Sequence, residues 1–464
     1  MFLKQYYLAC LSHASYLIGD ETTGSAVVVD PQRDVDGYLE DAARAGLRIE
    51  HVFLTHFHAD FVAGHLELAA RVGARIHLGA KAQAEFPFSP ARDGDKLVLG
   101  RVRLEILETP GHTPEGISIL VVDTERDAEV PHGILTGDTL FIGDVGRPDL
   151  LSAKGLTARD LANSMYATLR EKILPLPDST LVYPAHGAGS ACGKNLSRDT
   201  FSTLGVQKRV NWALQPMDRE SFVRVLTADQ PAMPAYFPYD AELNGKVRAT
   251  LEESLAAGLR PLTLEQVLHE QAAGALVLDA REPGEWTAGH LRGSVNVGLS
   301  GTYASWVGAL IPATRPLILV APPGRQLEAA VRLGRIGFDR LAGYLDGGAA
   351  AWRGREDLLR QSTRLSPMEF AARLAHAHPP CVLDVRTQAE WDAGRLPGAV
   401  HIPLPELAAR AGELPRDRPI AVHCKGGYRS VIAVSLLEPL GLGPLSDLEG
   451  GYQAWVAAGQ TTLA

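Results

Sequence analysis

An internal duplication constrains the second half of this chain more than any other feature of its sequence. Residues 276–297 read LVLDAREPGEWTAGHLRGSVNV and residues 381–402 read CVLDVRTQAEWDAGRLPGAVHI, an offset of 105 residues. A second matching pair follows, Leu345-Asp-Gly-Gly before Trp352 and Leu448-Glu-Gly-Gly before Trp455. Copies of about 100 residues have the size of domains, whereas solenoid repeats are shorter. Each copy alternates short apolar strands with helical stretches, which predicts a small parallel-sheet α/β fold twice over.

The length of the chain leaves room for one further block before the duplication. A chain of 464 residues is expected to form two to four domains. We place the two copies at residues 258–358 and 362–464. The block before them, placed at residues 1–245, alternates strands with helices and ends near the proline-rich segment QPAMPAYFP at 230–238. The prediction is an α/β multi-domain protein with three domains.

Composition excludes several classes of protein. The net charge of −9 argues against a nucleic-acid partner bound through bulk charge. No apolar run approaches the roughly 18 residues that a membrane span needs, and the first residues lack the features of a signal peptide. Four cysteines are too few for a disulfide framework in a chain of this length. We therefore expect a cytoplasmic protein without a membrane segment.

Histidines and acids follow several apolar strands of the first block. The segments concerned are Thr55-His-Phe-His-Ala-Asp60, Pro110-Gly-His-Thr-Pro114, Leu135-Thr-Gly-Asp138 and Tyr183-Pro-Ala-His186. Any one of these histidines, taken alone, is more often a capping or packing group than a ligand. The ordered set, always just past a strand, predicts a metal site assembled from several strand ends.

Across the first block this set resembles the metallo-β-lactamase superfamily, which implies an αββα sandwich. The superfamily's loop motif is His-x-His-x-Asp-His, and Phe61 here replaces the last histidine, which helps to hold a second metal in the zinc hydrolases. The resemblance is best to the persulfide dioxygenases, which implies a mononuclear non-haem Fe(II), O2 as co-substrate, and the ligands His56, His112 and Asp138. Two histidines and one carboxylate form the facial triad of non-haem Fe(II) oxygenases, which leaves positions open for O2 and a substrate sulfur.

Two residues of the first loop have alternative roles. His58 could ligate, as in the zinc hydrolases, but we favour an orienting role for it and for Asp60. A zinc-dependent thioester hydrolase resembling hydroxyacylglutathione hydrolase, fused to a sulfurtransferase, therefore stays open as an alternative function.

Three further residues of the first block are candidates for substrate contact. The resemblance places Arg147 beside the thiol substrate, with pairing to Asp144 or Asp149 as an equal alternative. Tyr183 is a candidate hydrogen-bond donor near the metal, or a packing residue. Cys192 lies among small residues past the last histidine loop, where it could meet a persulfide or be inert.

The sharpest motif of the chain lies in the second copy. In Ile420-Ala-Val-His-Cys424-Lys-Gly-Gly-Tyr-Arg429-Ser430, an apolar strand ends at a cysteine and a glycine-containing loop leads into an apolar helix. Loop N–H groups and a helix N-terminus that point at the sulfur favour the reactive thiolate. The motif predicts a nucleophilic Cys424 and an anionic substrate.

This loop resembles the active loop of the rhodaneses, the thiosulfate sulfurtransferases. The resemblance covers the whole copy, including Asp384-Val-Arg and Glu449-Gly-Gly. Four residues separate the cysteine from Arg429, where the related phosphatases have five, and the smaller cradle favours sulfur over phosphate. The expected substrate-binding residues are Lys425, Gly426, Gly427, Tyr428, Arg429 and Ser430.

The first copy lacks this nucleophile. Its matching strand leads into Ala321-Pro-Pro-Gly-Arg325, so alanine stands at the cysteine position. We interpret it as a degenerate rhodanese-like domain that packs between the active domains or builds an oligomer contact.

Both chemistries use the sulfane sulfur of a persulfide. We predict oxidation of a low-molecular-weight thiol persulfide, such as glutathione persulfide, to sulfite and thiol. We also predict transfer of sulfur to or from thiosulfate through a Cys424 persulfide. The expected partners are these small molecules and, as a homo-oligomer, further copies of the chain.

Overall fold

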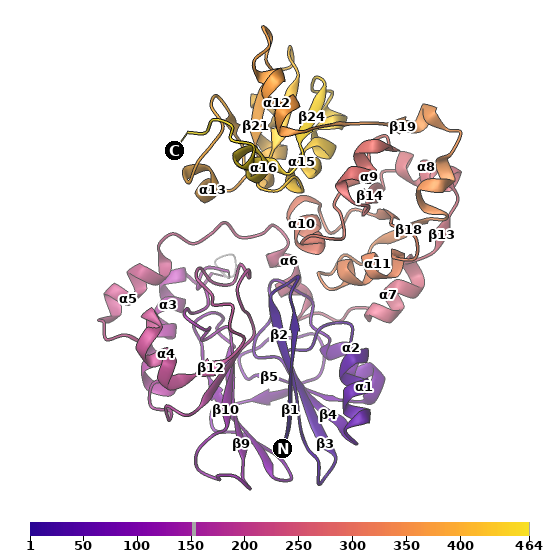
Figure 1. Cartoon of the computed structure of the whole chain (residues 1–464). Helices are drawn as coiled ribbons and strands as arrows, with labels where there is room; N and C mark the ends of the chain where they lie inside the picture. Colours follow the sequence, from indigo (N-terminus) through magenta and orange to yellow (C-terminus); the bar gives the residue numbers. More distant parts are fainter. Residues whose placement is uncertain (151–154, 464) are drawn as a thin grey trace. The chain divides into compact units, whose positions relative to one another are not determined.

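The structure, a computed structural model, describes residues 1–150 and 155–463 (Figure 1). The chain divides into two compact units. The first holds Met1–Glu253 and the short segment Gly334–Gly337, and the second holds Ser254–Leu333 and Phe338–Ala464. Among the described residues, no helix is both long enough and apolar enough to cross a membrane.

The first unit is built on two six-stranded sheets. One has the order β1-β2-β3-β4-β5-β6 and the other the order β12-β11-β10-β9-β8-β7. The strands of the first are β1 (Phe2–Leu8), β2 (His13–Asp20), β3 (Ser25–Val29), β4 (Arg48–Phe53), β5 (Arg75–Gly79) and β6 (Ser89–Ala91). Those of the second are β7 (Lys96–Leu99), β8 (Val102–Glu108), β9 (Ile117–Asp123), β10 (Gly133–Gly137), β11 (Leu181–Pro184) and β12 (Ser202–Thr203).

Apolar side chains from both sheets form one core between them. Tyr16 and Phe53 of the first sheet pack in the same cluster as Leu104, Ile119 and Leu135 of the second. Burial of such side chains contributes about 1.5–3 kcal/mol each relative to exposure, which holds the sheets face to face. Every residue of β2 and of β10 is buried, because both faces of each strand are covered.

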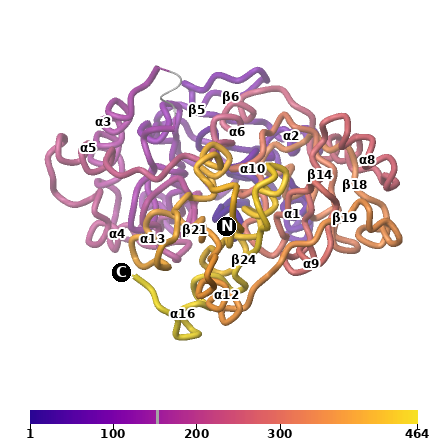
Figure 2. The backbone as a smooth tube through the Cα atoms, turned by 90° about the horizontal axis from the view of Figure 1, so that it is seen from above, coloured from indigo at the N-terminus to yellow at the C-terminus, as the bar shows by residue number. Residues whose placement is uncertain are grey.

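Helices cover the outer faces of this sandwich. Helices α1 (Asp36–Arg44) and α2 (His65–Val72) flank the first sheet, and α3 (Ala158–Thr168), α4 (Leu204–Val210) and α5 (Arg219–Thr227) flank the second (Figure 1). The last three lie together in both views (Figures 1 and 2). Their apolar faces pack in a second cluster with residues of β10 and β11. Helices α6 (Phe237–Leu243) and α7 (Leu251–Gly258) follow. The predicted αββα architecture is confirmed.

The second unit contains the two copies, apart from Gly334–Gly337 of the first copy, and the sheets of the two copies share one topology. The first sheet has the order β13-β18-β17-β14-β16 and the second β20-β24-β23-β21-β22, and all neighbours are parallel. The first copy holds β13 (Pro261–Leu262), β14 (Leu276–Asp279), β16 (Val295–Asn296), β17 (Leu317–Val320) and β18 (Leu341–Leu345). The second holds β20 (Thr363–Leu365), β21 (Cys381–Asp384), β22 (Val400–His401), β23 (Ile420–His423) and β24 (Leu445–Leu448). A separate two-stranded pairing joins β15 (His290–Leu291) to β19 (Leu359–Arg360).

The helices of the two copies also correspond, except that a 3-10 helix, Gly348–Trp352, stands in the first copy where the second has α16 (Gly451–Ala457). They are α8 (Leu264–Ala272), α9 (Pro283–Ala288), α10 (Tyr303–Leu310) and α11 (Gln326–Gly334) in the first copy. In the second copy they are α12 (Pro367–Leu374), α13 (Gln388–Asp392), α14 (Leu407–Arg410), α15 (Arg429–Leu437) and α16 (Gly451–Ala457). α8 and α12 each begin with a capping box, in which a hydroxyl and the acid or amide three residues on satisfy free backbone N–H groups. Two small parallel α/β folds are therefore confirmed, while the exact domain boundaries stay predictions.

Candidate metal centre and sulfur-transfer site

The strands of the first unit bring the candidate ligands to one end of the sandwich. His56 follows β4 of the first sheet, while His112 and Asp138 follow β8 and β10 of the second. An isolated antiparallel bridge between His13 and His186 joins the two sheets at this end. Loops that leave facing sheets at the same end converge, which is why residues far apart in sequence meet here.

Three of these side chains point their ligand atoms at a common position. The candidate atoms of His56, His112 and Asp138 lie within 4.8 Å of one another, and all three residues are buried. Asp138 Oδ2 lies 3.8 Å from His56 Nε2 and 3.4 Å from His112 Nε2. This oxygen has no hydrogen-bond partner. Because buried polar atoms are almost always satisfied, an unpartnered carboxylate oxygen facing two imidazoles fits a bound cation.

Hydrogen bonds on the far side of each imidazole set its orientation. His112 Nδ1 lies 2.8 Å from the carbonyl oxygen of Arg147 and donates to it, which leaves Nε2 with its lone pair toward Asp138. His56 Nδ1 lies 3.0 Å from Oγ1 of Thr55, which itself donates to Asp30. Burial lowers the pKa of both His56 and His112. Neutral imidazole is the form that binds a metal.

Both ring nitrogens of His186 lie close to carboxylates. Nδ1 lies 2.8 Å from Asp138 Oδ1, and Nε2 lies 2.8 Å from Asp60 Oδ2 without a hydrogen bond. Burial opposes protonation of His186, but the two carboxylates outweigh burial and raise its pKa well above the ordinary value. The bond from His186 to Oδ1 orients Asp138 and leaves Oδ2 for a cation.

His58, Asp60 and His186 form a second group whose ligand atoms lie within 4.8 Å. His58 directs Nε2 at Asp30 Oδ1, 3.0 Å away, and its ring lies against that of His56, 4.1 Å between centroids. Both nitrogens of His58 and Oδ1 of Asp60 make no hydrogen bond among the described residues. The geometry therefore fits ligands as well as orienting groups, and the orienting role that we favoured for His58 and Asp60 stays a prediction.

Cys192 lies beside the cluster. Its sulfur, one oxygen of Asp138 and one nitrogen of His186 lie within 4.8 Å of one another. Burial and the nearby carboxylates of Asp60 and Asp138 raise the pKa of this thiol well above its ordinary value. Cys192 is therefore a buried thiol beside the cluster, and its contact with substrate stays a prediction.

Cys424 directly follows strand β23 and begins the loop that leads into α15. The N–H of Gly427 donates to Sγ at 3.1 Å, and the thiol donates to the hydroxyl oxygen of Ser430 at 3.7 Å. The backbone at Gly427 has φ +83°, a conformation that glycine adopts without strain. A backbone N–H aimed at the sulfur stabilises negative charge on it, so the loop suits a thiolate nucleophile.

The charged residues of this loop have partners of their own. Arg429 makes a bidentate ion pair with Glu390, both bonds 2.8 Å long. Ser430 donates to Asp447, which is buried and also bound by Arg364. A direct role of Arg429 or Ser430 in substrate binding stays a prediction, as it does for Lys425 and Gly426.

The degenerate copy repeats the scaffold without the thiol. Ala321 follows β17 as Cys424 follows β23. The ion pairs Asp279–Arg281 and Asp384–Arg386 occupy matching positions after the first long strand of each copy. The shared framework accounts for the sequence match, and only the loop chemistry differs.

Comparison with known proteins agrees with both halves of this description. The profile of the metallo-beta-lactamase superfamily matches residues 8–186, and that of the rhodanese-like domain matches 263–355 and 366–458. The solved structure of a metallo-beta-lactamase from Staphylococcus aureus subsp. aureus COL is 34% identical, with a TM-score of 0.66 over 74% of this chain and 98% of that chain.

The chain belongs to the metallo-beta-lactamase superfamily. Its first unit is similar to two curated enzymes. The mitochondrial persulfide dioxygenase ETHE1 of Bos taurus is 31% identical over 49% of this chain and 80% of that protein. The cytoplasmic hydroxyacylglutathione hydrolase of Arabidopsis thaliana is 29% identical over 54% of this chain and 90% of that protein. The chain is thus a superfamily enzyme that carries two rhodanese-like domains.

Arg147 and Tyr183 were both predicted to contact substrate. In the structure Arg147 makes an ion pair and Tyr183 packs in the core, which are the alternatives that the sequence left open. Arg147 is 1% exposed and makes two bonds of 2.7 Å to Asp149, with further bonds to the carbonyls of Ala191 and Pro231. Tyr183 packs in the core between the sheets, its ring centroid 5.7 Å from that of Tyr16. A substrate carboxylate could reach Arg147 only by displacing one of its present partners.

Sequence reasoning missed two residues at the cluster. Asp30 ends the buried run Val27-Val28-Val29 and accepts from both the N–H and the hydroxyl of Thr55. Its position after an apolar strand is the same signal that identified Asp138. His13 begins β2, and its ring lies 3.9 Å from that of Phe61 with both nitrogens unpartnered. Nothing in the local sequence marks His13.

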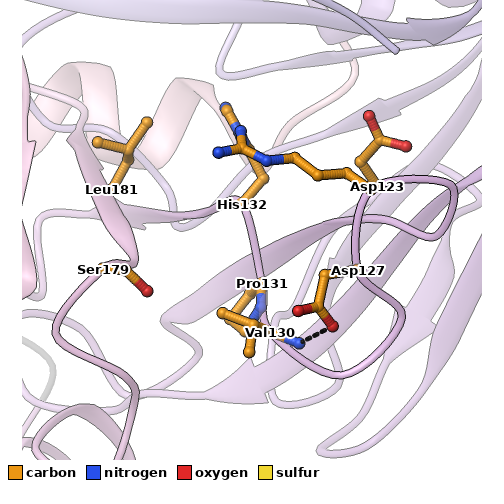
Figure 3. Close-up of a pocket in the computed structure, with 8 residues that line it drawn as sticks. Asp123, Asp127, Val130, Pro131, His132, Ser179 and Leu181 are labelled. Carbon is orange, nitrogen blue, oxygen red and sulfur yellow. Dashed lines mark hydrogen bonds between the residues drawn. The ribbon is translucent and has the colours of Figure 1, made fainter.

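A polar pocket lies at the other end of the second sheet (Figure 3). It has a volume of about 270 Å³ and is lined by residues that include Asp123, Asp127 and His132. His132 precedes β10, whereas Asp138 follows it. The pocket is therefore separate from the candidate metal centre.

Proposed function

We propose that the first unit oxidises a low-molecular-weight thiol persulfide with O2, using mononuclear Fe(II), and that the second unit transfers sulfane sulfur through Cys424. One observation carries the first half. Three side chains converge on an unpartnered oxygen of Asp138, whose other oxygen is bonded to His186, and Phe61 stands where the loop motif of the superfamily has a further histidine. This favours one metal with open coordination positions over a two-metal site.

Fe(II) held by His56, His112 and Asp138 would supply positions at which the substrate sulfur and O2 both bind. Hydrogen bonds orient two of these ligand side chains. The Arg147 carbonyl fixes His112, and His186 fixes Asp138. The net reaction is R–S–SH + O2 + H2O → R–SH + SO3²⁻ + 2 H⁺.

The sulfur transfer needs a thiolate and a displaced anion. Cys424 thiolate attacks the outer sulfur of thiosulfate, its S–S bond breaks, and sulfite leaves with the electron pair. The product is a Cys424 persulfide, whose charge the Gly427 N–H can stabilise. Run in reverse, the same step makes thiosulfate from sulfite. Relatives named persulfide dioxygenase and the two rhodanese-like domains support this place in sulfur metabolism.

The preferred thiol and the homo-oligomer stay predictions. Small thiol persulfides, thiosulfate and sulfite are the partners that the chemistry of the two sites favours. Their common feature is a transferable or oxidisable sulfur next to a negative charge.

O2 uptake with glutathione persulfide tests the proposal on the iron-loaded full chain. We expect His56→Ala to abolish O2 uptake and to retain thiosulfate:thiol sulfur transfer, and Cys424→Ser to do the reverse. Iron-loaded wild type that consumes no O2 with this substrate would contradict the oxygenase half. Cys424→Ser with full sulfur transfer would contradict the other half.

The zinc-dependent thioester hydrolase is the second candidate. It is favoured by the second group of His58, Asp60 and His186 and by the similarity to a hydroxyacylglutathione hydrolase. It predicts two zinc ions per chain, hydrolysis of S-lactoylglutathione, and no O2 uptake with persulfide. Metal analysis together with these two assays distinguishes the candidates.

A further inference from the structure

The degenerate copy contacts the active loop of the catalytic copy through one tyrosine. Tyr428, four residues after Cys424, donates from its hydroxyl to the carbonyl oxygen of Gly298 at 2.6 Å. Gly298 belongs to the first copy and lies just after β16. The same ring rests against Gly301, where an added Cβ would lie 2.5 Å from the ring carbon Cζ. Tyr428 is therefore seated in a small recess of the degenerate copy.

The recess is a built feature of the degenerate copy. Arg332 of α11 donates to the carbonyls of Leu299 and Gly301 at 2.6 and 2.8 Å, and it is itself buried. Glu282 accepts from the N–H and the hydroxyl of Ser300. Arg332 and Glu282 thus bond to all of the residues from 299 to 301, the segment that receives Tyr428.

The helix that follows the active loop rests on the same copy. Ser435 of α15 accepts from the backbone N–H of Asn296 at 3.1 Å. Glu438, just past the helix, lies 3.1 Å from the buried ring nitrogen of His290. Strand β16 accordingly packs against α15. Tyr428 precedes the first residue of α15, so its anchor holds the end of the loop, while Ser435 and Glu438 hold the helix about two turns further on.

Tyr428 is also covalently next to the group that contacts the sulfur. Gly427 presents its N–H to Cys424 Sγ, while its carbonyl accepts from Arg364. The carbonyl of Gly427 shares a peptide plane with Tyr428, so fixing Tyr428 and this carbonyl limits the rotations about Gly427 Cα that aim its N–H. Release of Tyr428 would allow the Gly427 N–H to turn away from the sulfur, which would weaken its stabilisation of the thiolate.

We propose that the degenerate copy is a positioning element of the sulfur-transfer site, and that Tyr428 acts through Gly427 as its positioning residue. The inference rests on the proposed sulfur transfer at Cys424. It assigns the first copy a role that needs no cysteine of its own, and it makes residues of that copy determinants of Cys424 reactivity.

Two substitutions from opposite sides of the contact test this in the full chain. Tyr428→Phe removes the hydroxyl, and Gly301→Ala fills the recess from the other copy. Gly301 has a backbone conformation that alanine can adopt, so the effect of the new methyl group is on the tyrosine. Gly284→Ala is the matched control, because it adds a methyl group to α9 of the same copy with no atom within 4 Å.

Two readouts separate positioning from general destabilisation. One is the rate at which iodoacetamide alkylates Cys424, followed on its own peptide by mass spectrometry across pH. The other is kcat/KM for thiosulfate. We expect about a three- to tenfold loss in both at neutral pH for Tyr428→Phe and Gly301→Ala, the range that one neutral hydrogen bond can carry. The alkylation profile should shift to higher pH, and Gly284→Ala should match the wild type.

The double variant adds a further constraint. Because both changes break the same contact, it should be no slower than the worse single variant. Wild-type rates and pH profiles in both single variants would overturn the inference. Wild type that alkylates normally but transfers no sulfur would instead contradict the proposed function. Losses in the alkylation rate without a pH shift would show a structural role only and would also overturn the inference.

Discussion

At the scale of single residues, the two carboxylate oxygens of Asp138 have different contacts. Oδ1 binds His186 and Oδ2 faces His56 and His112 without a partner. The phenylalanine that departs from the superfamily loop motif, Phe61, packs its ring on His13 instead of offering a nitrogen. The charge and the ligand count at the cluster therefore suit one metal ion.

Asp138→Asn should lower iron binding strongly. The amide removes the one negative charge among the three ligands, and we expect at least a tenfold loss of iron affinity. Metal analysis of the purified protein after loading with Fe(II) without oxygen measures it. Asp127→Asn is the control, since Asp127 lies in the separate pocket and only accepts backbone N–H bonds through Oδ1. Equal iron content in both variants would remove Asp138 from the ligand set.

The Glu390–Arg429 pair should make stability depend on pH. Burial would raise the pKa of Glu390, but the bonds from Arg429 outweigh it and lower the pKa from 4.5 to about 2. A depressed folded-state pKa means that the stabilisation is complete above the unfolded value of 4.5 and is lost as pH falls toward 2. Because Glu390 is partly exposed, we expect Glu390→Gln to cost about 1 kcal/mol at pH 7.

Urea unfolding of wild type and Glu390→Gln between pH 7 and 2.5 measures this difference. It should shrink steadily below pH 4.5. Glu413→Gln offers the comparison of a fully exposed acid that also pairs with an arginine, Arg410, and its effect should be much smaller. A difference that stays constant across the pH range would show that the ion pair is not its source.

At the scale of elements, strand ends and close glycines place the site. Strands β4, β8 and β10 carry their ligands to one end of the sandwich. The Gly143–Asp149 loop then returns over the cluster, and its close approach is possible because residue 146 has no side chain. A Cβ at Gly146 would lie 2.1 Å from the carbonyl oxygen of Asp138 and 2.9 Å from Nδ1 of His112.

Gly146→Ala should therefore displace two metal ligands together. We expect at least a tenfold loss of iron affinity and of O2 uptake, with sulfur transfer at Cys424 retained. Gly37→Ala is the matched control, because a Cβ there meets nothing within 4 Å. In helix α1 it should add about 0.5–1 kcal/mol of stability. Full iron binding by Gly146→Ala would contradict the geometry of the loop.

At the scale of the whole molecule, the chain forms two compact units, each with one of the two chemistries. The candidate metal centre lies within the first unit, and Cys424 lies within the second. A ligand stabilises only the unit that binds it in the folded state. Metal loading should therefore affect the two units differently.

Calorimetry should show two unfolding transitions. Fe(II) added without oxygen at about 100 times its dissociation constant should stabilise one of them by about 2.7 kcal/mol and leave the other in place. The His56→Ala variant should lose this shift. A single transition, or a metal shift of both, would contradict independent units.

Sequence patterns were sufficient for the features that depend on local order. The duplication, the strand–loop–helix around Cys424 and the strand-end histidines rest on periodicity and neighbouring residues, and the fold they predicted is confirmed. The hydrogen-bond partners of individual side chains could not be predicted from these patterns. Arg147 pairs with Asp149 and Tyr428 reaches Gly298, 130 residues earlier in the chain. Hydrogen bonds between distant residues depend on how sheets and copies pack, and a local pattern carries no information about that packing.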